Sequence, residues 1–404
     1  MKIDPLNINL KGLRFLNDRG ISQAVDYGLI KINPGIDFEK DKKRLQPSTL
    51  DLKLAQVEDS FELVGSYPVD FSFDQNKTKI VARSKNEILL TEEIKHDRQI
   101  PEFNLDFIFP VIDGRSSVRR LGCFVPNHGT MFYAHNDGTT VELNNYSAND
   151  IYFDKGERVV QSFFRIDPFK DQILRGMDIT IMDLIQVKVP AITSKNLEEI
   201  FEKARSLDMG IEITTNEQLE WLQKEGYMKI SPNVKFKDGY VLVHASKNAS
   251  SINKIDGGII FSKRKEYADK LHKPLNITNS YTIKPFEHID IETVEQFELS
   301  QHVGIQFYNN PADKFLDQVR QNSTSVSIDN LSLTHMIDGW VDPCYEGPFS
   351  RQPKWFSKTH VKPGDIIGYG KAIFYPNGVQ TGYGDASLGS QYNKAKATAI
   401  ADMR

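Results

Sequence analysis

One segment of the chain combines a tight turn with arginines and hydroxyl groups. From Asp113 to Gly122 it reads DGRSSVRRLG, and it follows the apolar run Phe107 to Ile112. A strand that ends in such a turn places backbone N–H groups, hydroxyls and guanidinium groups in one concavity, which suits phosphate oxygens. The segment is a candidate anion site. The alternative interpretation is a capped turn that carries its arginines at the surface.

The same segment resembles a known protein family. Its string GRSSVRRLG is similar to the GRSSLARLG element of dCTP deaminases, the motif that holds the nucleotide phosphates in related dUTPases. The strings GLIKINP from Gly28 and LQPSTLDLKL from Leu45 also resemble that family's N-terminus, so the resemblance spans most of residues 20–170. It implies that Arg115 and Ser117 face the triphosphate of a deoxynucleotide.

The resemblance also assigns a catalytic carboxylate. The string VELNNY, from Val141, falls on the family's strand that carries the catalytic glutamate, and Gly156 follows Glu142 at the family's distance of 14 residues (156 − 142 = 14). The resemblance implies that Glu142 is the proton shuttle, that Ser116 helps hold the attacking water, and that Arg120 lies against the carboxylate or the intermediate. A solvent-facing glutamate on an alternating strand is the alternative.

Hydrolytic deamination of cytosine requires water at C4, a proton on the ring nitrogen and a proton on departing ammonia, and one buried carboxylate can serve all three. Zinc deaminases instead use His-x-Glu and Pro-Cys-x-x-Cys motifs. This chain has no His-x-Glu, and its two cysteines, Cys123 and Cys344, lie 221 positions apart (344 − 123 = 221). The resemblance therefore implies deamination of dCTP to dUTP and ammonia without zinc, with Mg²⁺ bound to the nucleotide as the expected cofactor. Two alternatives stay open: a dUTP pyrophosphatase, alone or bifunctional, and a catalytically silent nucleotide-binding protein.

A second motif lies far along the chain. Residues 337–347 read IDGWVDPCYEG and resemble the family's Gly-[FW]-[IV]-Asp-Pro-Gly hairpin, which cradles base and deoxyribose. The resemblance implies that Asp342 accepts a hydrogen bond from the 3′-hydroxyl and that Tyr345 lies against the sugar. Cys344 replaces the usual Gly, so we expect a strained or differently shaped turn. A structural hairpin with a buried Trp and Tyr is the alternative.

The C-terminal residues 377–404 contain four Gly and little apolar periodicity, which predicts a mobile strap. From Tyr383 onward the strap resembles the family's closing tail. The resemblance implies that Tyr383, Tyr392 and Lys394 bind the nucleotide when the strap closes. A tail without a role is the alternative.

Each half of the chain lacks a part that the other keeps. The first half has no Asp-Pro-Gly hairpin before Glu142, and the second half has no Arg in its nearest counterpart of the phosphate element, residues 321–325. We therefore expect a composite site: the first half brings Glu142 and the phosphate element, and the second half brings the hairpin. The alternative is a second half that only stands in for a neighbouring subunit.

An internal repeat supports two related halves. Residues 28–38 align without a gap on residues 226–236, and both copies follow a short helical pattern that ends at a Gly suited to the left-handed C′ position. Short apolar or alternating runs elsewhere predict an all-β fold, and the resemblance implies two tandem dUTPase-like distorted β-barrel domains of jelly-roll type, with a few short helices. We expect an N-terminal domain over 1–192, a helical junction over 193–214 with its helix at 195–207, and a C-terminal domain over 215–404.

Composition restricts the partners. The chain has 404 residues, a formal net charge of −4 and no long run of Lys or Arg, so we expect no nucleic-acid partner. No stretch has the 18 apolar residues of a spanning helix, and the first ten residues carry no apolar signal-peptide core, so we expect no membrane partner and a cytoplasmic location. Since relatives in the family are trimers, we expect a homo-oligomer, either a trimer or a dimer of tandems.

Overall fold

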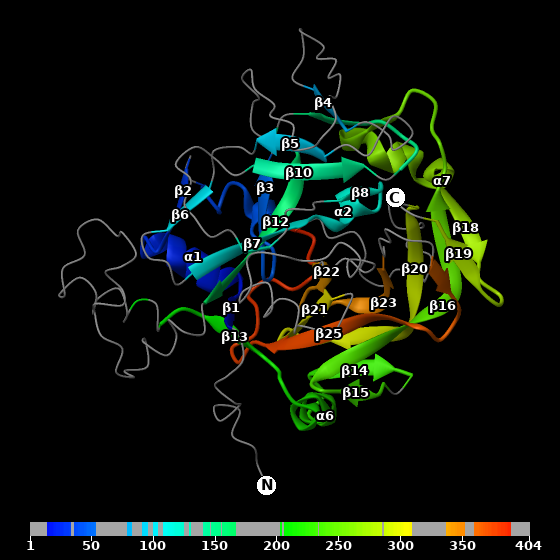
Figure 1. Cartoon of the computed structure of the whole chain (residues 1–404). Helices are drawn as coiled ribbons and strands as arrows, with labels where there is room; N and C mark the ends of the chain where they lie inside the picture. The colour runs from blue at the N-terminus through cyan, green and yellow to red at the C-terminus, as the bar shows by residue number, and fades with distance from the viewer. Residues whose placement is uncertain are drawn as a thin grey trace, which may run out of the picture.

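The protein is mostly β, with a few short helices (Figure 1). The computed structural model describes residues 14–33, 36–53, 79–82, 91–95, 100–103, 108–124, 129–130, 140–145, 147–154, 156–166, 203, 206–232, 234–284, 287–308, 337–351 and 359–388. The mostly-β expectation is confirmed, whereas the closure of each half into a barrel of its own stays a prediction.

The elements follow the order that the alternating runs predict. The first half contains β1 (Arg14–Leu16), α1 (Asp18–Asp26), β2 (Ile30–Asn33), the 3₁₀ helix η2 (Lys42–Arg44), β3 (Leu50–Lys53), β4 (Lys79–Ala82), β5 (Thr91–Lys95), β6 (Ile100–Phe103), β7 (Ile108–Gly114), α2 (Ser116–Arg119), β8 (Cys123–Phe124), β9 (Gly129–Thr130), β10 (Thr140–Asn145), β11 (Ile151–Asp154) and β12 (Arg158–Ile166). The second half contains β13 (Met209–Glu212), α6 (Asn216–Lys224), β14 (Met228–Ser231), β15 (Phe236–Lys237), β16 (Tyr240–Ile252), β17 (Ile259–Ile260), the 3₁₀ helix η4 (Phe261–Tyr267), α7 (Ala268–Leu271), β18 (His272–Asn276), β19 (Tyr281–Ile283), β20 (Ile289–Leu299), β21 (Val303–Tyr308), β22 (Ile337–Val341), β23 (Glu346–Arg351), β24 (Thr359–Val361) and β25 (Ile366–Phe374).

The largest sheet has 15 strands and crosses from one half to the other. Its main path is β14-β20-β16-β25-β13-β1-β12-β7-β9, so β13 and β1 form the seam between the halves (Figure 1). The seam is antiparallel, with Arg14 opposite Ile211 and Leu16 opposite Met209. The predicted helical junction over 193–214 is therefore wrong for residues 209–212, which form a strand. Pairing with β1 on one side and β25 on the other satisfies the backbone groups of β13, which outweighs local helix preference.

The repeated segments fold alike at their start. In α1 the Asn17 side chain caps the helix by accepting from the Gly20 N–H, and Gly28 follows the helix with φ of 70°. In α6 Thr215 and Gln218 form a capping box, and Gly226 follows with φ of 77°. Both helices, both left-handed glycines and the strands after them were predicted, and all are confirmed.

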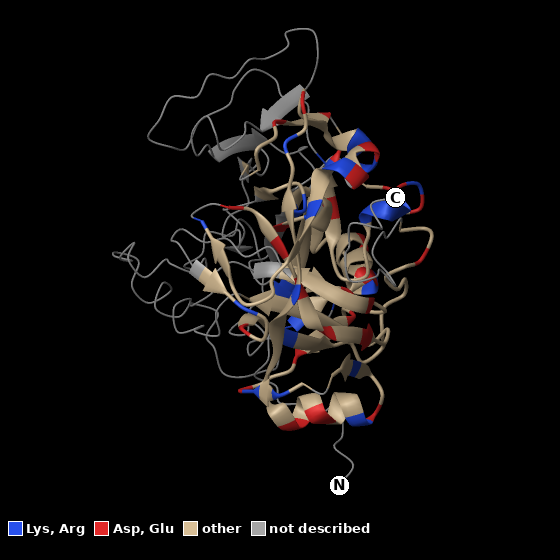
Figure 2. Cartoon of the chain, turned by 90° about the vertical axis from the view of Figure 1, so that its right-hand side faces the viewer, with Lys and Arg blue, Asp and Glu red and all other residues tan. Residues whose placement is uncertain are grey.

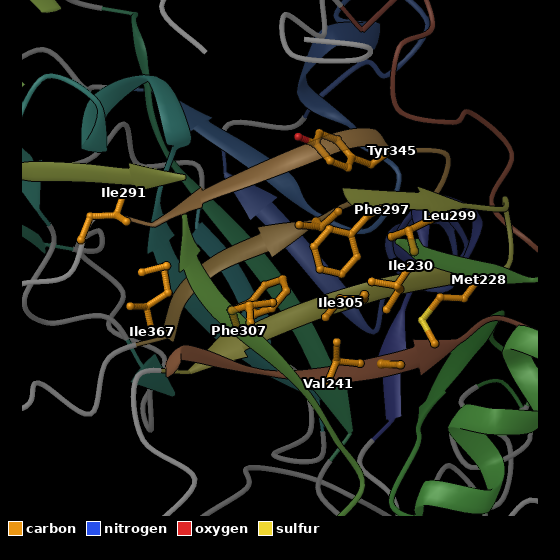
Figure 3. Close-up of a cluster of buried hydrophobic side chains, with 14 of the residues drawn as sticks. Met228, Ile230, Val241, Ile291, Phe297, Leu299, Ile305, Phe307, Tyr345 and Ile367 are labelled. Carbon is orange, nitrogen blue, oxygen red and sulfur yellow. The ribbon is translucent and has the colours of Figure 1, made fainter. Parts of the chain in front are cut away.

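Two buried clusters hold the halves, and the first draws residues from both. It contains Phe153 and Phe164 of the first half together with Ile259, Phe261 and Leu271, which come from the second half of the sequence. The second cluster lies within the second half; Figure 3 shows part of it, including Met228, Ile230, Val241, Phe297, Ile305 and Phe307. Residues 259–271 therefore stabilise the first half, and the boundary drawn from the sequence separates residues that pack together.

The first part of the C-terminal strap is packed rather than mobile, so that expectation is wrong for residues 377–388. The backbone N–H groups of Gln380 and Thr381 donate to the Asp18 carboxylate at 3.0 and 2.8 Å, and Val379 and Leu388 are buried. A carboxylate at the start of α1 satisfies this stretch of backbone, and no periodicity in the sequence signals such a contact. Residues 389–404 lie outside the described part of the chain.

Charges of both signs are interspersed on the side of the molecule shown in Figure 2. In the described residues, no helix is long and apolar enough to cross a membrane.

Candidate functional site

Both halves of the chain line one cleft, which holds roughly 1060 Å³ of empty space including space open to solvent. The first half contributes the predicted anion segment, and the second half contributes the 339–345 turn and the strap. The lining residues are Gln46, Asp51, Asp113, Gly114, Arg115, Ser116, Ser117, Arg119, Arg120, Arg158, Gln161, Arg264, Gly339, Trp340, Val341, Asp342, Tyr345, Phe349, Ser350, Tyr383 and Leu388. The arrangement agrees with a composite site.

A cluster of arginines surrounds one buried carboxylate of the cleft. Asp51 Oδ1 lies 3.2 Å from Arg115 Nε, and Asp51 Oδ2 lies 3.0 Å from Arg158 Nη1. Burial raises the pKa of Asp51, and the two arginines oppose that shift. Burial also lowers the pKa of Arg158, and so does the nearby positive charge of Arg115 and Arg264. Three guanidinium groups this close together favour a polyanion between them.

The anion segment is fixed by an ion pair within it. After β7, the short helix α2 begins at Ser116, and the Arg119 guanidinium binds the carboxylate of Asp113. Both side chains are buried, and burial raises the pKa of Asp113 while Arg119 opposes the shift. Arg119 therefore holds the turn, which leaves Arg115, Ser116 and Ser117 at the wall of the cleft.

Arg120 connects the first half to the second. Its Nη1 lies 3.5 Å from Oδ2 of Asp290 on β20, and both side chains are almost completely buried. His272 lies near this pair, and its burial lowers the pKa of the imidazole. The predicted site arginine thus contacts a carboxylate that the sequence did not single out.

The segment 337–347 forms two strands and a turn, but its strands do not pair with each other in the described ladders. β22 pairs with β21 and β23 pairs with β20, which corrects the expected hairpin. Longer neighbouring strands offer each arm a complete ladder, and the arms separate after a four-residue turn. Cys344 adopts φ of 69°, which confirms the expected strain at the position where the family has Gly.

Asp342 at this turn is held from both halves. Its Oδ1 accepts hydrogen bonds from the Ser48 hydroxyl at 2.9 Å and from Trp340 Nε1 at 3.0 Å. Burial raises the pKa of Asp342 to about 7, and these two hydrogen bonds oppose the shift. The carboxyl group is therefore a proton-binding group near neutral pH.

The strap closes one side of the cleft. The Tyr383 N–H donates to the Pro343 carbonyl at 2.9 Å, and the Tyr383 and Tyr345 rings lie 5.6 Å apart. Burial raises the pKa of Tyr345 well above its ordinary value, so its hydroxyl stays protonated and donates to the Pro348 carbonyl. Aromatic rings at this end suit a planar or apolar ligand group.

Seven of the predicted site residues line the cleft together: Arg115, Ser116, Ser117, Arg120, Asp342, Tyr345 and Tyr383. Glu142 lies on β10 opposite Glu93 of β5, but its side chain is outside the described part of the structure, as are Tyr392 and Lys394. Sequence reasoning missed Arg158 and Arg264. Arg158 had a signal, because it follows the Lys-Gly-Glu turn of the repeat, whereas Arg264 had none.

Metal ligands and histidines add little to this site. The described residues contain no group of three or more His, Cys, Asp or Glu that could hold a metal ion. His302, which sequence reasoning treated as an ordinary histidine, pairs with the Tyr375 carbonyl through Nδ1 at 2.8 Å.

The chain is similar to known proteins over its first half and, in fold, over most of its length. A family model described as dCTP deaminase-like matches residues 15–166. A dCTP deaminase, dUMP-forming, of Sulfurihydrogenibium sp. is 29% identical over 158 residues, which are 37% of this chain and 82% of that protein. The Aquifex aeolicus protein of the same name is 24% identical over 163 residues, 40% of this chain and 87% of that protein.

A solved structure extends the likeness of fold. The crystal structure of 2′-deoxycytidine 5′-triphosphate deaminase from Agrobacterium tumefaciens has a TM-score of 0.59, covers 91% of this chain and 100% of its own, and is 11% identical. At this identity the likeness concerns the fold alone.

Proposed function

Residues 15–166 place the chain in the dCTP deaminase/dUTPase family, and from this we propose that it is an enzyme of pyrimidine deoxynucleotide metabolism that deaminates dCTP. The observation that carries the proposal is the cleft itself. Arg115, Arg158 and Arg264 line it together with Trp340 and Tyr345. This combination fits a ligand with a polyphosphate at one end and a ring at the other.

The proposed roles follow the family resemblance residue by residue. Glu142 moves protons between the attacking water, the ring nitrogen and the departing ammonia, without zinc. Ser116 holds the water and Arg120 stabilises the charged form of the carboxylate or intermediate.

Substrate contacts are assigned in the same way. Arg115 and Ser117 bind the triphosphate, which carries Mg²⁺ as part of the substrate. Asp342 and Tyr345 bind the sugar, and the strap residues Tyr383, Tyr392 and Lys394 close over the nucleotide. Assembly into a homo-oligomer remains a prediction.

The product has two candidates. Deamination alone converts dCTP and water into dUTP and ammonia, which is the product expected from the sequence. The two relatives are named dUMP-forming, which favours a second step in which another water cleaves the α–β phosphoanhydride and releases pyrophosphate. Asp342 is the proposed base for that water, because its pKa of about 7 suits proton transfer near neutral pH.

The test is a product analysis of the purified chain with dCTP and Mg²⁺. We expect one ammonia per nucleotide consumed. Pyrophosphate in equal amount, with dUMP as the nucleotide, identifies the two-step reaction, whereas dUTP without pyrophosphate identifies simple deamination. Cleavage of added dUTP without any action on dCTP would favour a pyrophosphatase, and nucleotide binding without chemistry would favour a silent binding protein.

Arg264 provides a separate check on the phosphate end. Its guanidinium packs over the Phe261 ring, 4.5 Å from the centroid, which presents it to the cleft on a fixed support. Arg264→Gln removes one charge-assisted hydrogen bond to the triphosphate, worth about 1.5–3 kcal/mol, so we expect KM for dCTP to rise roughly 10- to 100-fold with little change in kcat.

The matched control is Lys263→Gln, because Lys263 is the exposed cationic neighbour in the same 3₁₀ helix. An Arg264→Gln enzyme with the KM of the Lys263→Gln enzyme would remove Arg264 from the phosphate site.

A further inference from the structure

Buried polar atoms without a partner lie at the part of the cleft formed by the second half. Among the described residues, Glu292 Oε2 and the hydroxyl oxygens of Ser117 and Ser350 have no hydrogen-bond partner. Each such atom costs about 1–3 kcal/mol when it stays unsatisfied. A ligand that satisfies these atoms would recover that free energy, so their position indicates where such a ligand binds.

The strand register places Glu292 beside the cleft. Glu292 of β20 lies directly opposite Ser350 of β23, and directly opposite residues share one face of an antiparallel pair. Ser350 lines the cleft, as does its neighbour Phe349, which stacks on Phe307 with 4.7 Å between ring centroids. The unsatisfied carboxylate oxygen and the unsatisfied hydroxyl are therefore neighbours on the same wall.

The alternation along β20 gives that wall its direction. Ile289 and Ile291 belong to the core of the second half, where Figure 3 shows Ile291. Asp290 and Glu292 alternate with them and so face the opposite side of the strand. Asp290 reaches Arg120 of the first half at 3.5 Å, which shows that this side meets the predicted site residues.

The surroundings of Glu292 keep its ionisation close to neutral pH. Burial raises the pKa of Glu292 to about 7, Asp290 on the same strand raises it further, and a hydrogen bond from Asn248 of β16 lowers it. Tyr345 from the turn lies within the electrostatic reach of both Glu292 and Arg120. His272 of β18 lies next to Asp290 and Arg120, and its burial lowers the pKa of the imidazole.

We propose that Glu292 and Ser350, both from the second half, bind the hydrogen-bonding edge of the pyrimidine ring and select cytosine over uracil. This inference rests on the proposed function. The ionised carboxylate accepts a hydrogen bond from the exocyclic amino group of cytosine, and the Ser350 hydroxyl donates to the adjacent ring acceptor. Uracil carries an acceptor oxygen in place of the amino group, so it meets the carboxylate unfavourably.

The selection depends on pH. When Glu292 binds a proton, its hydroxyl can donate to the uracil oxygen, and the preference for cytosine weakens. We therefore expect the ratio of dUTP to dCTP dissociation constants to be about tenfold larger at pH 8 than at pH 6, since one charge-assisted hydrogen bond is gained or lost.

The test measures binding and turnover separately. Wild-type turnover of dCTP decides the proposed function. Dissociation constants for dCTP, dUTP and dGTP come from titration calorimetry in a Glu142→Gln background, with and without Glu292→Gln or Ser350→Ala. Glu298→Gln is the matched control, because Glu298 lies on the same strand and is exposed.

In the Glu292→Gln protein we expect dCTP binding at pH 8 to weaken about tenfold and the pH dependence of the dUTP/dCTP ratio to disappear, because a neutral amide can donate or accept. Ser350→Ala should weaken both pyrimidine nucleotides. Glu298→Gln should leave every constant unchanged.

Two results would overturn the inference: a Glu292→Gln protein with the selectivity and pH dependence of Glu298→Gln, or equal affinity of the unsubstituted site for dGTP and dCTP. If Glu292→Gln lowers the thermal midpoint so far that binding is not measurable, the Ser350→Ala constants decide alone. Absence of wild-type turnover alongside intact cytosine selectivity would reject the deaminase proposal and keep this one.

Discussion

Replacing Glu142 with Gln will lower the rate of dCTP deamination by about 10³-fold, because positioned proton transfer contributes about 10²–10⁴ to such reactions and an amide cannot exchange protons. Binding of dCTP should change little, since the triphosphate and sugar contacts come from other residues. The measurement is single-turnover ammonia release with dCTP and Mg²⁺, alongside the dissociation constant of the variant.

The control uses the residue opposite on the neighbouring strand. Glu93 of β5 pairs in register with Glu142 of β10, so Glu93→Gln changes the same kind of side chain one strand away. Loss of deamination in Glu93→Gln with full activity in Glu142→Gln would show that the assignment by sequence register is wrong. Full activity in both variants would exclude a carboxylate shuttle on either strand.

Local signals in the sequence predicted the local structure well. The Gly residues after α1 and α6 are left-handed, as expected at a C′ position, and the apolar run before Gly114 forms β7. The phosphate-like segment could be identified because its residues are contiguous, so one string carries both its shape and its chemistry. The strain at Cys344 followed from a single substitution of Gly in a recognised turn.

Contacts between distant segments could not be predicted. The Thr381 N–H donates to Asp18 across 363 positions, and Arg120 meets Asp290 across 170. Neither pair leaves a periodic or compositional trace, because each depends on how the two halves are placed against each other. The same reason explains why Arg264 and Glu292 were missed: each is an ordinary charged residue until the fold brings it to the cleft.

The second half therefore does more than cover the first. It supplies Arg264 and the 339–345 turn to the cleft, and Ile259, Phe261 and Leu271 to the first core. A second half that was only a structural stand-in would not need charged residues at the wall of the cleft. The composite-site hypothesis accounts for both contributions with one arrangement.

Asp342→Asn will change how stability depends on pH. The pKa of Asp342 is about 7 in the folded chain, against 3.8 as the ordinary value. Between these values the folded protein keeps a proton that the unfolded chain has lost, so the free energy of unfolding falls as pH rises and levels off above pH 7. Over pH 5 to 8 this group alone removes about 3 kcal/mol, at about 1.4 kcal/mol for each pKa unit.

The Asn side chain keeps an oxygen that can accept from Ser48 and Trp340, and it carries no charge to bury. Urea unfolding at pH 5 and pH 8 should therefore show the variant gaining about 3 kcal/mol relative to wild type between the two pH values. Asp256→Asn, at an exposed position, should gain nothing. A constant difference between wild type and Asp342→Asn at both pH values would mean that Asp342 is already ionised at pH 5, and its proposed role as a base near neutral pH would then fail.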